Sequence, residues 1–592
     1  MTEVLVLATW VVWCAALTGL GLLLLSIFAA RTSLRARLHA APWLGLAVLL
    51  VVAGAVQLFV PMGGTWGQWL SGVVLVGGIG NLLVTLRGHW RGMQSALGRG
   101  LSARRLPVLI VIALFGLGVV LVARFATAEP MDADAGGYRI GAILYAEAFK
   151  AVPGLANLHF RFGFDSTLWP FAALTGNGIW AGQGFRLVTG LFLSLLFIDI
   201  AMRVLAPRRT GSRPGDWFII LAASFIGAII LTDSGRWVPS PAQDICVLIV
   251  AVAATGFLVD FVGKARNPRL SGSMAIVLSC AAGTLRPLGW LLAGATVAVV
   301  ASVLLHQARQ RALPARRVFR QLLPPVLFGV MAFLVMGARD WVLSGWLLYP
   351  LPAAPFPVSW RAADPTNVSR WITSWGRAPE LDAEAVLASN DWLGPWIGNF
   401  WASRELYLLR FMAIAAVLPL AWPAGRRAWR AAWRPSLLAM LPSALTVVAW
   451  FVTAPDVRFG WAGLIGVVAV PLSFVLQRNA YPYWIARGVG AAILVVMLVT
   501  QFLNGRVNPR GADPVATTAG WGFLHTTLHL APPPNTKTIS GTLSDGTPVT
   551  YPAEGNNCWA SFPLCLLPGS GGNVVRRGDQ ISDGFEQMTT NR

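Results

Sequence analysis

Charged residues are scarce in this sequence, and their scarcity indicates the solvent in which the protein folds. Only 12% of the 592 residues are charged, whereas 56% are hydrophobic, and the mean hydropathy is +0.62. A water-soluble domain usually has a charged fraction of about a quarter. The composition therefore excludes a soluble globular protein of this size and indicates a chain that folds in the lipid bilayer.

Several signatures of nucleotide and metal chemistry are absent. The chain has no Walker A loop, no Rossmann glycine fingerprint and no HExxH pair, so ATP-driven transport, cytoplasmic nucleotide-sugar chemistry and zinc proteolysis lose support. His525 and His529 are four residues apart and could bind a metal from one helix face, but no glutamate accompanies them and surface histidines are favoured. We predict no metal site, and a divalent cation is the one possible cofactor.

The amino terminus lacks a basic stretch before its first apolar run, and Glu3 lies near its start. We therefore expect Val4–Ala29 to be a retained membrane span rather than a cleaved signal peptide. Apolar runs of about 17–25 residues recur along the chain, and each is long enough for a helix to cross the bilayer with its backbone groups paired. The predicted fold is an all-α polytopic membrane protein.

The distribution of arginine predicts which helix ends face the cytoplasm. The net charge of +21 would suggest nucleic acid in a soluble protein. Here the basic residues cluster in short loops between apolar runs, as the positive-inside rule describes, so we expect no nucleic-acid partner. The clusters are Arg31–Arg37, Arg87–Arg105, Arg208–Arg213, Lys264–Arg269, Arg309–Arg320 and Arg426–Arg434.

With these loops in the cytoplasm, the chain has about 14 transmembrane helices and both termini are extracytoplasmic. The spans are expected near 4–29, 43–60, 70–86, 106–125, 185–205, 217–231, 245–262, 274–284, 288–305, 322–336, 409–421, 436–452, 461–476 and 489–502. The eighth is short and ends before Arg286-Pro287, which suggests a broken helix that lines a cavity.

The same topology divides the chain into alternating membrane and external parts. These are N-terminal transmembrane helices (1–125), a first large external loop (126–184), central transmembrane helices (185–337), a second large external segment (338–408), C-terminal transmembrane helices (409–503) and a small external C-terminal α+β or irregular domain (504–592).

The chain has only five cysteines. Cys14, Cys246 and Cys280 lie in apolar runs and are expected to behave as small hydrophobic residues. Cys558 and Cys565 lie close together in the tail and predict a disulfide, which requires an oxidising compartment. The alternative is two free thiols in a cytoplasmic tail, which would invert the topology. The spacing and the lack of nearby histidines disfavour zinc.

Acidic residues at the start of the first external loop are the candidate catalytic groups. Asp134, with Asp132 as second choice, follows a span directly and could accept a proton from a sugar hydroxyl as it attacks an anomeric carbon. A departing lipid phosphate would need cationic donors, and the planar guanidinium binds phosphate oxygens in pairs. The candidate substrate- or phosphate-binding residues are Tyr138, Arg139, His159, Arg161, Arg236, Arg286, Arg339 and Arg458.

Each of these arginines has a plain structural alternative, as a surface residue or as the partner of an internal aspartate. The possible partners are Asp132, Asp134, Asp165, Asp244 and Asp456.

Asp244, Asp456 and Asn157 are secondary site candidates. Asp456 and Arg458 could flank an external mouth or form a local ion pair that caps the next helix. Asp244 could simply be an acid favoured at a helix start. External tryptophans could stack on sugar rings or pack beneath a loop. They are Trp360, Trp371, Trp375, Trp392 and Trp396.

Several motifs resemble a group of bacterial multi-spanning membrane proteins, mostly uncharacterised, that is likened to GT-C glycosyltransferases. They are Asp134 with Tyr138 four residues on, VPGLANLHFRFGF (152–164), PSPAQD (239–244), SGWLLYP (344–350), APDVRF (454–459) and the tail pieces around Cys558-Trp559, Cys565, Arg577-Gly578 and Asp583-Gly584-Phe585. The resemblance runs from about Asp132 to the end of the chain.

The resemblance implies a polyprenyl-phosphate sugar donor, inversion at the anomeric carbon and an essential aspartate in the first large external loop. Asp134 matches that aspartate best. The group often has Asp-x-Asp-x-Tyr-His there, whereas this chain has Gly136 and Arg139 in place of the second acid and the histidine. That departure argues against a metal-binding acid pair. Arg286 keeps a cation where the group tends to have lysine.

Three functions follow as hypotheses. The first is a glycosyltransferase of the bacterial inner (cytoplasmic) membrane, which transfers a sugar from a polyprenyl-phosphate donor to a cell-envelope glycan or another acceptor outside the cytoplasm. The second is a transporter or flippase of a lipid-linked glycan, although no internal repeat is evident and the polar residues gather on one side. The third is a non-catalytic scaffold of an envelope-polysaccharide complex.

Overall fold

The computed structural model describes residues 1–28, 32–89, 105–204, 213–233, 235–263, 267–312, 314–478, 515–521, 524–568 and 570–588. Within these ranges, ten helices are long and apolar enough to cross a membrane. They are α1 (Thr2–Phe28), α2 (Leu34–Gln57), α3 (Thr65–Gly88), α9 (Val188–Val204), α10 (Pro214–Thr232), α11 (Gln243–Val262), α13 (Leu288–Gln310), α14 (Ala315–Ser344), α19 (Pro423–Thr453) and α20 (Val457–Gln477). The chain is a multi-pass helical membrane protein, as predicted.

Further helices occupy three more of the predicted span positions. They are α5 (Arg105–Ala126), α12 (Pro268–Leu285) and α18 (Tyr407–Val417), the last of which continues as a 3-10 turn, Leu418–Ala421. The eighth span is not short, because α12 begins at Pro268 rather than Met274. The predicted span at 489–502 lies outside the described residues.

The break after α12 is where the sequence predicts it. Arg286 has extended backbone angles (φ −156°, ψ 137°), and α13 begins two residues later at Leu288. The chain therefore reverses within two residues and leaves the arginine side chain at the end of the bundle.

Many arginines of the basic clusters lie on helices rather than in loops, most clearly in two of the clusters. α14 begins at Ala315 and α19 at Pro423, so Arg316, Arg317 and Arg320 and the four arginines between 426 and 434 lie on the first turns of these helices. Arginine has a high helix propensity, and its long side chain can reach water from a helix end. The prediction of basic loops is wrong for these arginines, whereas Arg311 does lie in the turn between α13 and α14.

The segment predicted as the first external loop is mostly short helices with buried side chains. It contains a π turn (Ala135–Arg139), α6 (Ile140–Ala148), α7 (Leu155–Leu158), a 3-10 turn (Phe160–Gly163) and α8 (Leu168–Thr175). The second external segment contains α15 (Thr366–Arg377), α16 (Ala383–Ala388) and α17 (Leu393–Ala402).

The described part of the tail contains three separate antiparallel strand pairs. These are β1 (Val515–Trp521) with β2 (Leu524–Leu530), β3 (Thr538–Thr542) with β4 (Pro548–Pro552), and β5 (Val574–Arg576) with β6 (Phe585–Gln587). His525 and His529 lie in strand β2, so the helix on which they were proposed to share a face is not formed. Cys558 and Cys565 form the predicted disulfide.

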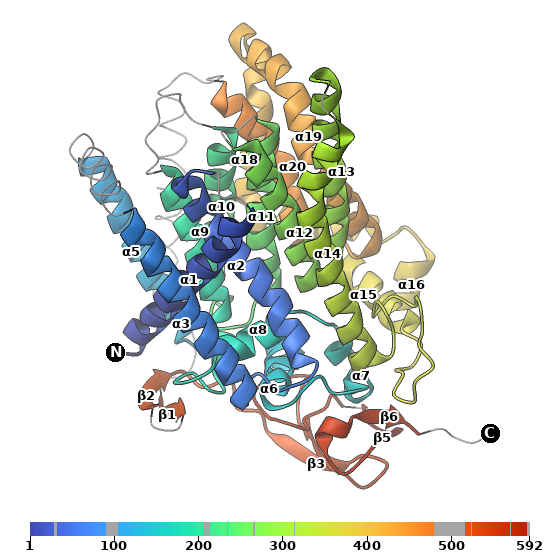
Figure 1. Ribbon diagram of the computed structural model, residues 1–592. Helices are drawn as coiled ribbons and strands as arrows, with labels where there is room; N and C mark the ends of the chain where they lie inside the picture. Colours follow the sequence, from blue (N-terminus) through green and yellow to red (C-terminus); the bar gives the residue numbers. More distant parts are fainter. Residues whose placement is uncertain are drawn as a thin grey trace.

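The tail packs against the same end of the bundle as the first external loop (Figure 1). The Phe585 amide donates to the Pro153 carbonyl at 2.9 Å, and the Ala531 amide donates to the Thr127 carbonyl at 2.9 Å. α19 ends and α20 begins at this end, so the arginine-bearing start of α19 lies at the opposite end (Figure 1).

Candidate functional site

Eight charged residues from five separate chain segments meet at the end of the bundle that the tail covers. We call them the Asp/Arg cluster. Its members are Asp132, Asp134, Arg139, Arg161, Asp244, Arg286, Asp456 and Arg458. All eight are residues that the sequence singles out. The five segments are the one after α5, the 3-10 turn Phe160–Gly163, the start of α11, the end of α12 and the loop between α19 and α20.

A π turn shapes the segment that contributes most to the cluster. Ala135–Arg139 form the turn, and the Ile140 amide donates to the Ala135 carbonyl across it. Such turns are rare and occur frequently at functional sites. Here the turn buries Arg139 and leaves the Asp134 side chain 25% exposed.

Arg139 is the centre of the cluster. Its guanidinium, only 1% exposed, donates to Asp132 at 2.9 Å, to Asp134 at 3.1 Å and to Asp244 at 2.9 Å. A buried arginine requires such partners because an unpaired charge inside a protein is costly. Arg139 therefore ties the first external loop to the start of α11.

Three partly exposed arginines surround this centre. Arg458 lies 3.4 Å and Arg161 3.6 Å from carboxylate oxygens of Asp134, and Arg286 pairs with the second oxygen of Asp244. We call Arg161, Arg286 and Arg458 the arginine rim.

Asp456 forms the local ion pair that caps the next helix, one of the two alternatives that the sequence left open. One of its carboxylate oxygens accepts from the Arg458 amide at 3.0 Å, which caps α20. The same oxygen accepts from the Arg458 guanidinium at 3.3 Å. Asp456 thus begins the helix and also orients a rim arginine.

Each rim arginine lies over an aromatic ring. Measured from the guanidinium carbon to the ring centroid, Arg161 is 5.1 Å from Trp371, Arg458 is 5.4 Å from Trp375 and Arg286 is 3.9 Å from Phe459. The rings form a row, because Trp371 and Trp375 are stacked 6.5 Å apart and Phe459 follows at 6.1 Å. A ring face holds a guanidinium in place without using its N–H donors.

Tyr138 contacts one buried and one rim arginine. Its ring centroid is 5.7 Å from the Arg139 guanidinium carbon and 5.8 Å from that of Arg161. The side chain is nearly buried. Tyr138 therefore separates the buried arginine from a rim arginine and supports both.

The first two aspartates differ in acidity. Burial raises the pKa of Asp132, and Arg139 offsets only part of that effect. Burial also opposes ionisation of Asp134, but Arg139 and Arg458 outweigh it and hold the pKa of that carboxyl below its usual range. Asp134 is thus an ionised carboxylate at neutral pH, whereas Asp132 is the easier of the two to protonate.

Arg339 lies outside the cluster. Its guanidinium pairs with Asp165 at 2.9 Å and also donates to Gln57 and to the Gly54 carbonyl, inside the bundle between α14 and α2. This is the internal salt bridge that the sequence left as the alternative. The prediction of Arg339 as a phosphate partner is not supported, because the pair is sealed within the helices.

His159 and Asn157 also have structural roles. Burial lowers the pKa of His159 to about 3, so this side chain is neutral and offers no charge to a phosphate. Its Nδ1 accepts from the Arg161 amide at 2.9 Å and begins the turn that places Arg161. Asn157 donates to the Trp360 and Phe585 carbonyls, which joins both external segments to the tail.

Arg236 lies at the edge of the site rather than within it. It pairs with Asp233 at 3.1 Å and is 43% exposed. Sequence analysis did not identify Glu405, which also lies at this edge. Two aspartates and two arginines shift the pKa of its carboxyl: Asp233, Asp456, Arg236 and Arg458. Burial, with a contribution from Asp233, raises the pKa of Glu405 to about 7, against the opposing effect of Arg458.

Of the five external tryptophans considered from the sequence, two adjoin the cluster and three do not. Trp371 and Trp375 form the aromatic row. The others pack against neighbouring segments: Trp360, Trp392 and Trp396.

The cluster does not suit a divalent cation. The Arg139 guanidinium lies among Asp132, Asp134 and Asp244, in the position where a cation would bridge the carboxylates. In the part of the chain that the structure describes, no group of three or more His, Cys, Asp or Glu side chains could hold a metal ion.

Comparison with known proteins places the chain in a family without assigning it an activity. No curated protein and no solved structure matches it. The model of a family described as a domain of unknown function, DUF8201, matches residues 4–465. That range contains the whole Asp/Arg cluster, whereas the tail lies beyond it. The chain belongs to the DUF8201 family.

Proposed function

We propose that this protein is a glycosyltransferase that transfers a sugar from a polyprenyl-phosphate donor to a cell-envelope glycan or another acceptor. The observation that carries the proposal is the position of Asp134, an accessible carboxylate among Arg139, Arg161 and Arg458 at the end of a transmembrane bundle. The arrangement provides a proton acceptor beside cations where a lipid-linked phosphate would lie.

The arginine rim suits a phosphate monoanion or diester. Each guanidinium has five N–H donors in a planar fork, and paired N–H···O bonds to phosphate are among the stronger hydrogen bonds in proteins. The aromatic row holds the three side chains in place before the donor binds, which lowers the entropy lost on binding.

Asp134 acts as general base in this mechanism. The acceptor hydroxyl oxygen attacks the anomeric carbon and forms the new C–O bond, while its proton passes to Asp134. The bond between the anomeric carbon and the phosphate oxygen breaks, and the polyprenyl phosphate leaves with the electron pair. Attack from the side opposite the leaving group inverts the anomeric centre.

Donor binding would also make Asp134 a better base. Without a donor, the neighbouring arginines lower the pKa of this carboxyl, so its proton affinity is low. A phosphate that takes over hydrogen bonds from Arg161 and Arg458 would weaken their hold on Asp134. The pKa of Asp134 would then rise when the leaving group is in place.

We propose that the site faces away from the cytoplasm of a bacterial inner membrane, with both termini on that side and about 14 spans in all. Two features support this orientation. The disulfide-bonded tail lies at the same end as the Asp/Arg cluster, and the arginine-bearing starts of α14 and α19 lie at the other. The pool of polyprenyl-phosphate sugars would then reach Asp134 from the outer leaflet.

The test is complementation of a deletion strain, with its surface glycans measured by mass spectrometry. The wild-type chain should restore a missing sugar, and Asp134→Asn at equal abundance should not. Asp391→Asn is the matched control, because Asp391 is exposed in the second external segment away from the cluster. Full restoration by Asp134→Asn would exclude the proposed mechanism.

A transporter of lipid-linked glycans is the second candidate, and the buried Arg339–Asp165 pair is the observation in its favour. Charged residues inside a transmembrane bundle often mark a transport pathway. A proteoliposome assay that follows lipid-linked glycan from one leaflet to the other separates the two candidates. Translocation that survives Asp134→Asn but is lost in Asp165→Asn would favour the transporter.

A further inference from the structure

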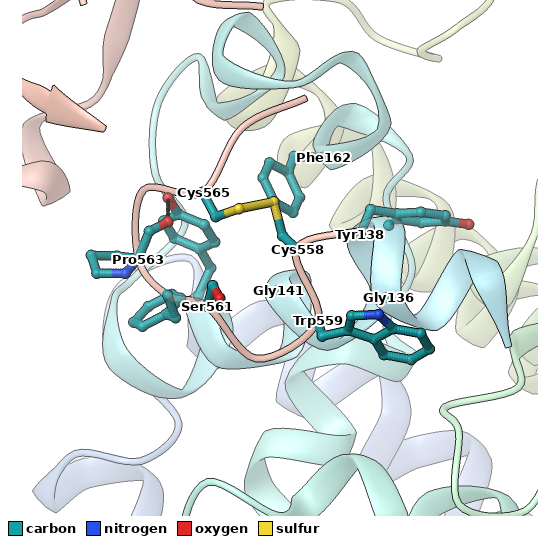
Figure 2. Close-up of a pocket in the computed structure, with 12 residues that line it drawn as sticks. Gly136, Tyr138, Gly141, Phe162, Cys558, Trp559, Ser561, Pro563 and Cys565 are labelled. Atoms are coloured by element: carbon teal, nitrogen blue, oxygen red, sulfur yellow. Dashed lines mark hydrogen bonds between the residues drawn. A yellow bond between two sulfur atoms is a disulfide. The ribbon is translucent and has the colours of Figure 1, made fainter. Parts of the chain in front are cut away.

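The loop closed by the tail disulfide lies directly on the π turn. Figure 2 shows the Trp559 indole beside Gly136 and Tyr138, with the Cys558–Cys565 bridge beside Phe162. The tail thereby contacts Gly136 and Gly137, two of the five residues that separate Asp134 from Ile140.

Trp559 and Gly136 are in close contact. The Trp559 amide donates to the Gly136 carbonyl at 2.9 Å. A Cβ atom added to Gly136 would lie 2.7 Å from the indole ring. At that distance the two groups would clash, and one of them would have to move. The absence of a side chain at Gly136 is therefore what admits the indole.

Gly137 occupies a similar gap. A Cβ atom there would lie 3.3 Å from the Arg161 guanidinium and 3.6 Å from the Asn557 side-chain oxygen. The two glycines of the π turn thus face the tail loop on one side and a rim arginine on the other.

Other contacts hold the tail loop in this place. The Tyr145 hydroxyl donates to the Pro563 carbonyl at 2.5 Å, and the Phe562 ring packs against the Tyr145 ring with centroids 5.0 Å apart. Trp559 itself has φ +47°, which is unusual for a bulky residue and costs free energy that surrounding contacts must offset.

The π turn needs such support. Gly-Gly has more conformational freedom than any other pair in the unfolded or loosened chain, so the turn is costly to order. The position of Asp134 relative to Arg139 depends on it, since one precedes the turn and the other ends it.

We propose that Trp559 is a positioning residue: seated on Gly136 by the disulfide loop, it holds the π turn in the conformation that sets Asp134 against Arg139 and the arginine rim. The expected effect of Trp559 on catalysis rests on the proposed function. Its expected effect on the π turn rests on geometry alone.

The test compares Trp559→Ala, Trp559→Phe and the double variant Cys558→Ser/Cys565→Ser with the wild-type chain in lipid nanodiscs. Tyr551→Ala is the matched control, because this aromatic residue packs within the tail against Gly541 and Ser570. Hydrogen–deuterium exchange of the 132–141 peptide reports the π turn without any substrate. Transfer kinetics with a polyprenyl-phosphate sugar report kcat and the donor KM separately.

Trp559→Ala should speed exchange in the 132–141 peptide and lower kcat by about 10–100-fold, the range expected when a catalytic group is displaced by about 1 Å. The donor KM should change little, because Arg286 and Arg458 lie on other segments. Trp559→Phe should recover most of the activity, the double cysteine variant should resemble Trp559→Ala, and Tyr551→Ala should resemble wild type.

The proposal fails if exchange in Trp559→Ala equals that of wild type, if kcat is unchanged, or if Tyr551→Ala has the same effects. The two proposals can fail separately. Absence of transfer by the wild-type chain would count against the glycosyltransferase, while the exchange measurements would still decide whether Trp559 holds the turn.

Discussion

Two buried arginines at opposite ends of the bundle each contact three aspartates, yet their surroundings differ. Arg139 contacts Asp132, Asp134 and Asp244, and Arg203 contacts Asp199, Asp216 and Asp260. Charge composition alone would assign both sites the same role.

Access separates the two clusters. Asp134 is 25% exposed, whereas Asp199 is fully buried and is also bonded to His39 at 2.5 Å. Asp260 packs so closely on Gly215 that a Cβ atom there would lie 2.3 Å from its carboxylate. The Arg203 cluster is sealed and ties the adjoining ends of α9, α10 and α11 together, which is a structural role.

The Asp/Arg cluster, in contrast, opens onto the arginine rim and its aromatic row. An incoming ligand cannot reach the Arg203 guanidinium, because it is buried among Asp199, Asp216 and Asp260. The rim arginines are 18–21% exposed and are held by ring faces, so an incoming anion can reach them. The comparison teaches that exposure and pre-positioned cations, rather than the number of ion pairs, identify the binding end of this bundle.

The strongest test of this difference is to replace one aspartate by asparagine in each of the two clusters. Asp134→Asn should lower kcat by about 10²–10⁴-fold, the usual contribution of a general base, with little change in thermal stability. Asp199→Asn should do the reverse, because Asp199 is fully buried and pairs with both Arg203 and His39, whereas Asp134 is partly exposed. Transfer kinetics and melting temperatures in one detergent measure both. Equal loss of stability in the two variants would contradict the distinction.

Removing the central cation of the sealed cluster should have the next largest effect. Arg203→Met removes the guanidinium that contacts all three carboxylates and should destabilise the fold by about 3–5 kcal/mol, seen as a much lower melting temperature and yield. Arg370→Met is the control, because Arg370 pairs with Glu384 on the surface, where such pairs contribute about 0–1 kcal/mol. Similar melting temperatures for the two variants would show that the Arg203 cluster is not structural.

A smaller effect should come from replacing a rim arginine by lysine, which keeps the positive charge but loses the planar guanidinium. Arg458→Lys retains a cation but loses the planar fork and its stacking on Trp375. The donor KM should rise about tenfold, the equivalent of one charge-assisted hydrogen bond, with kcat less affected. Arg370→Lys serves as control. An unchanged KM in Arg458→Lys would remove Arg458 from the phosphate site.

Much of this architecture could be predicted from the sequence. Apolar runs indicated most of the helices, and the arrangement of arginines between them put Asp134, Asp244, Arg286 and Arg458 at one end. Residues at the same end of neighbouring helices lie close together, so the predicted topology also predicts the cluster.

The rest depended on packing. Arg339 and Arg286 look alike in sequence, since each lies at the end of an apolar run, and only the fold shows that Asp165 faces the former. Residues four apart share a face in a strand as well as in a helix, so the spacing of His525 and His529 could not distinguish the two. The contact of Trp559 with Gly136 joins distant parts of the chain, and no local pattern indicates it.

The smallest expected effect concerns the pH dependence of sugar transfer. Arg139 and Arg458 hold the pKa of Asp134 below its usual range against the effect of burial. The proposed base is active when ionised, so kcat/KM should stay constant as pH falls and decline only below the ordinary range of an aspartate. Arg458→Gln removes one lowering influence, so the pKa of Asp134 rises and activity should be lost at a higher pH than in the wild type.

The measurement is kcat/KM against pH for the wild type, Arg458→Gln and Arg370→Gln, the last of which alters a surface arginine outside the cluster. A shift toward higher pH in Arg458→Gln alone would link the rim to the acidity of Asp134. A second decline near pH 7 that disappears in Glu405→Gln would assign it to Glu405, whose pKa of about 7 places its titration there. If kcat/KM declined at the same low pH in all three proteins, Arg458 would not influence the pKa of Asp134. A carboxylate that loses a neighbouring cation cannot keep the same pKa.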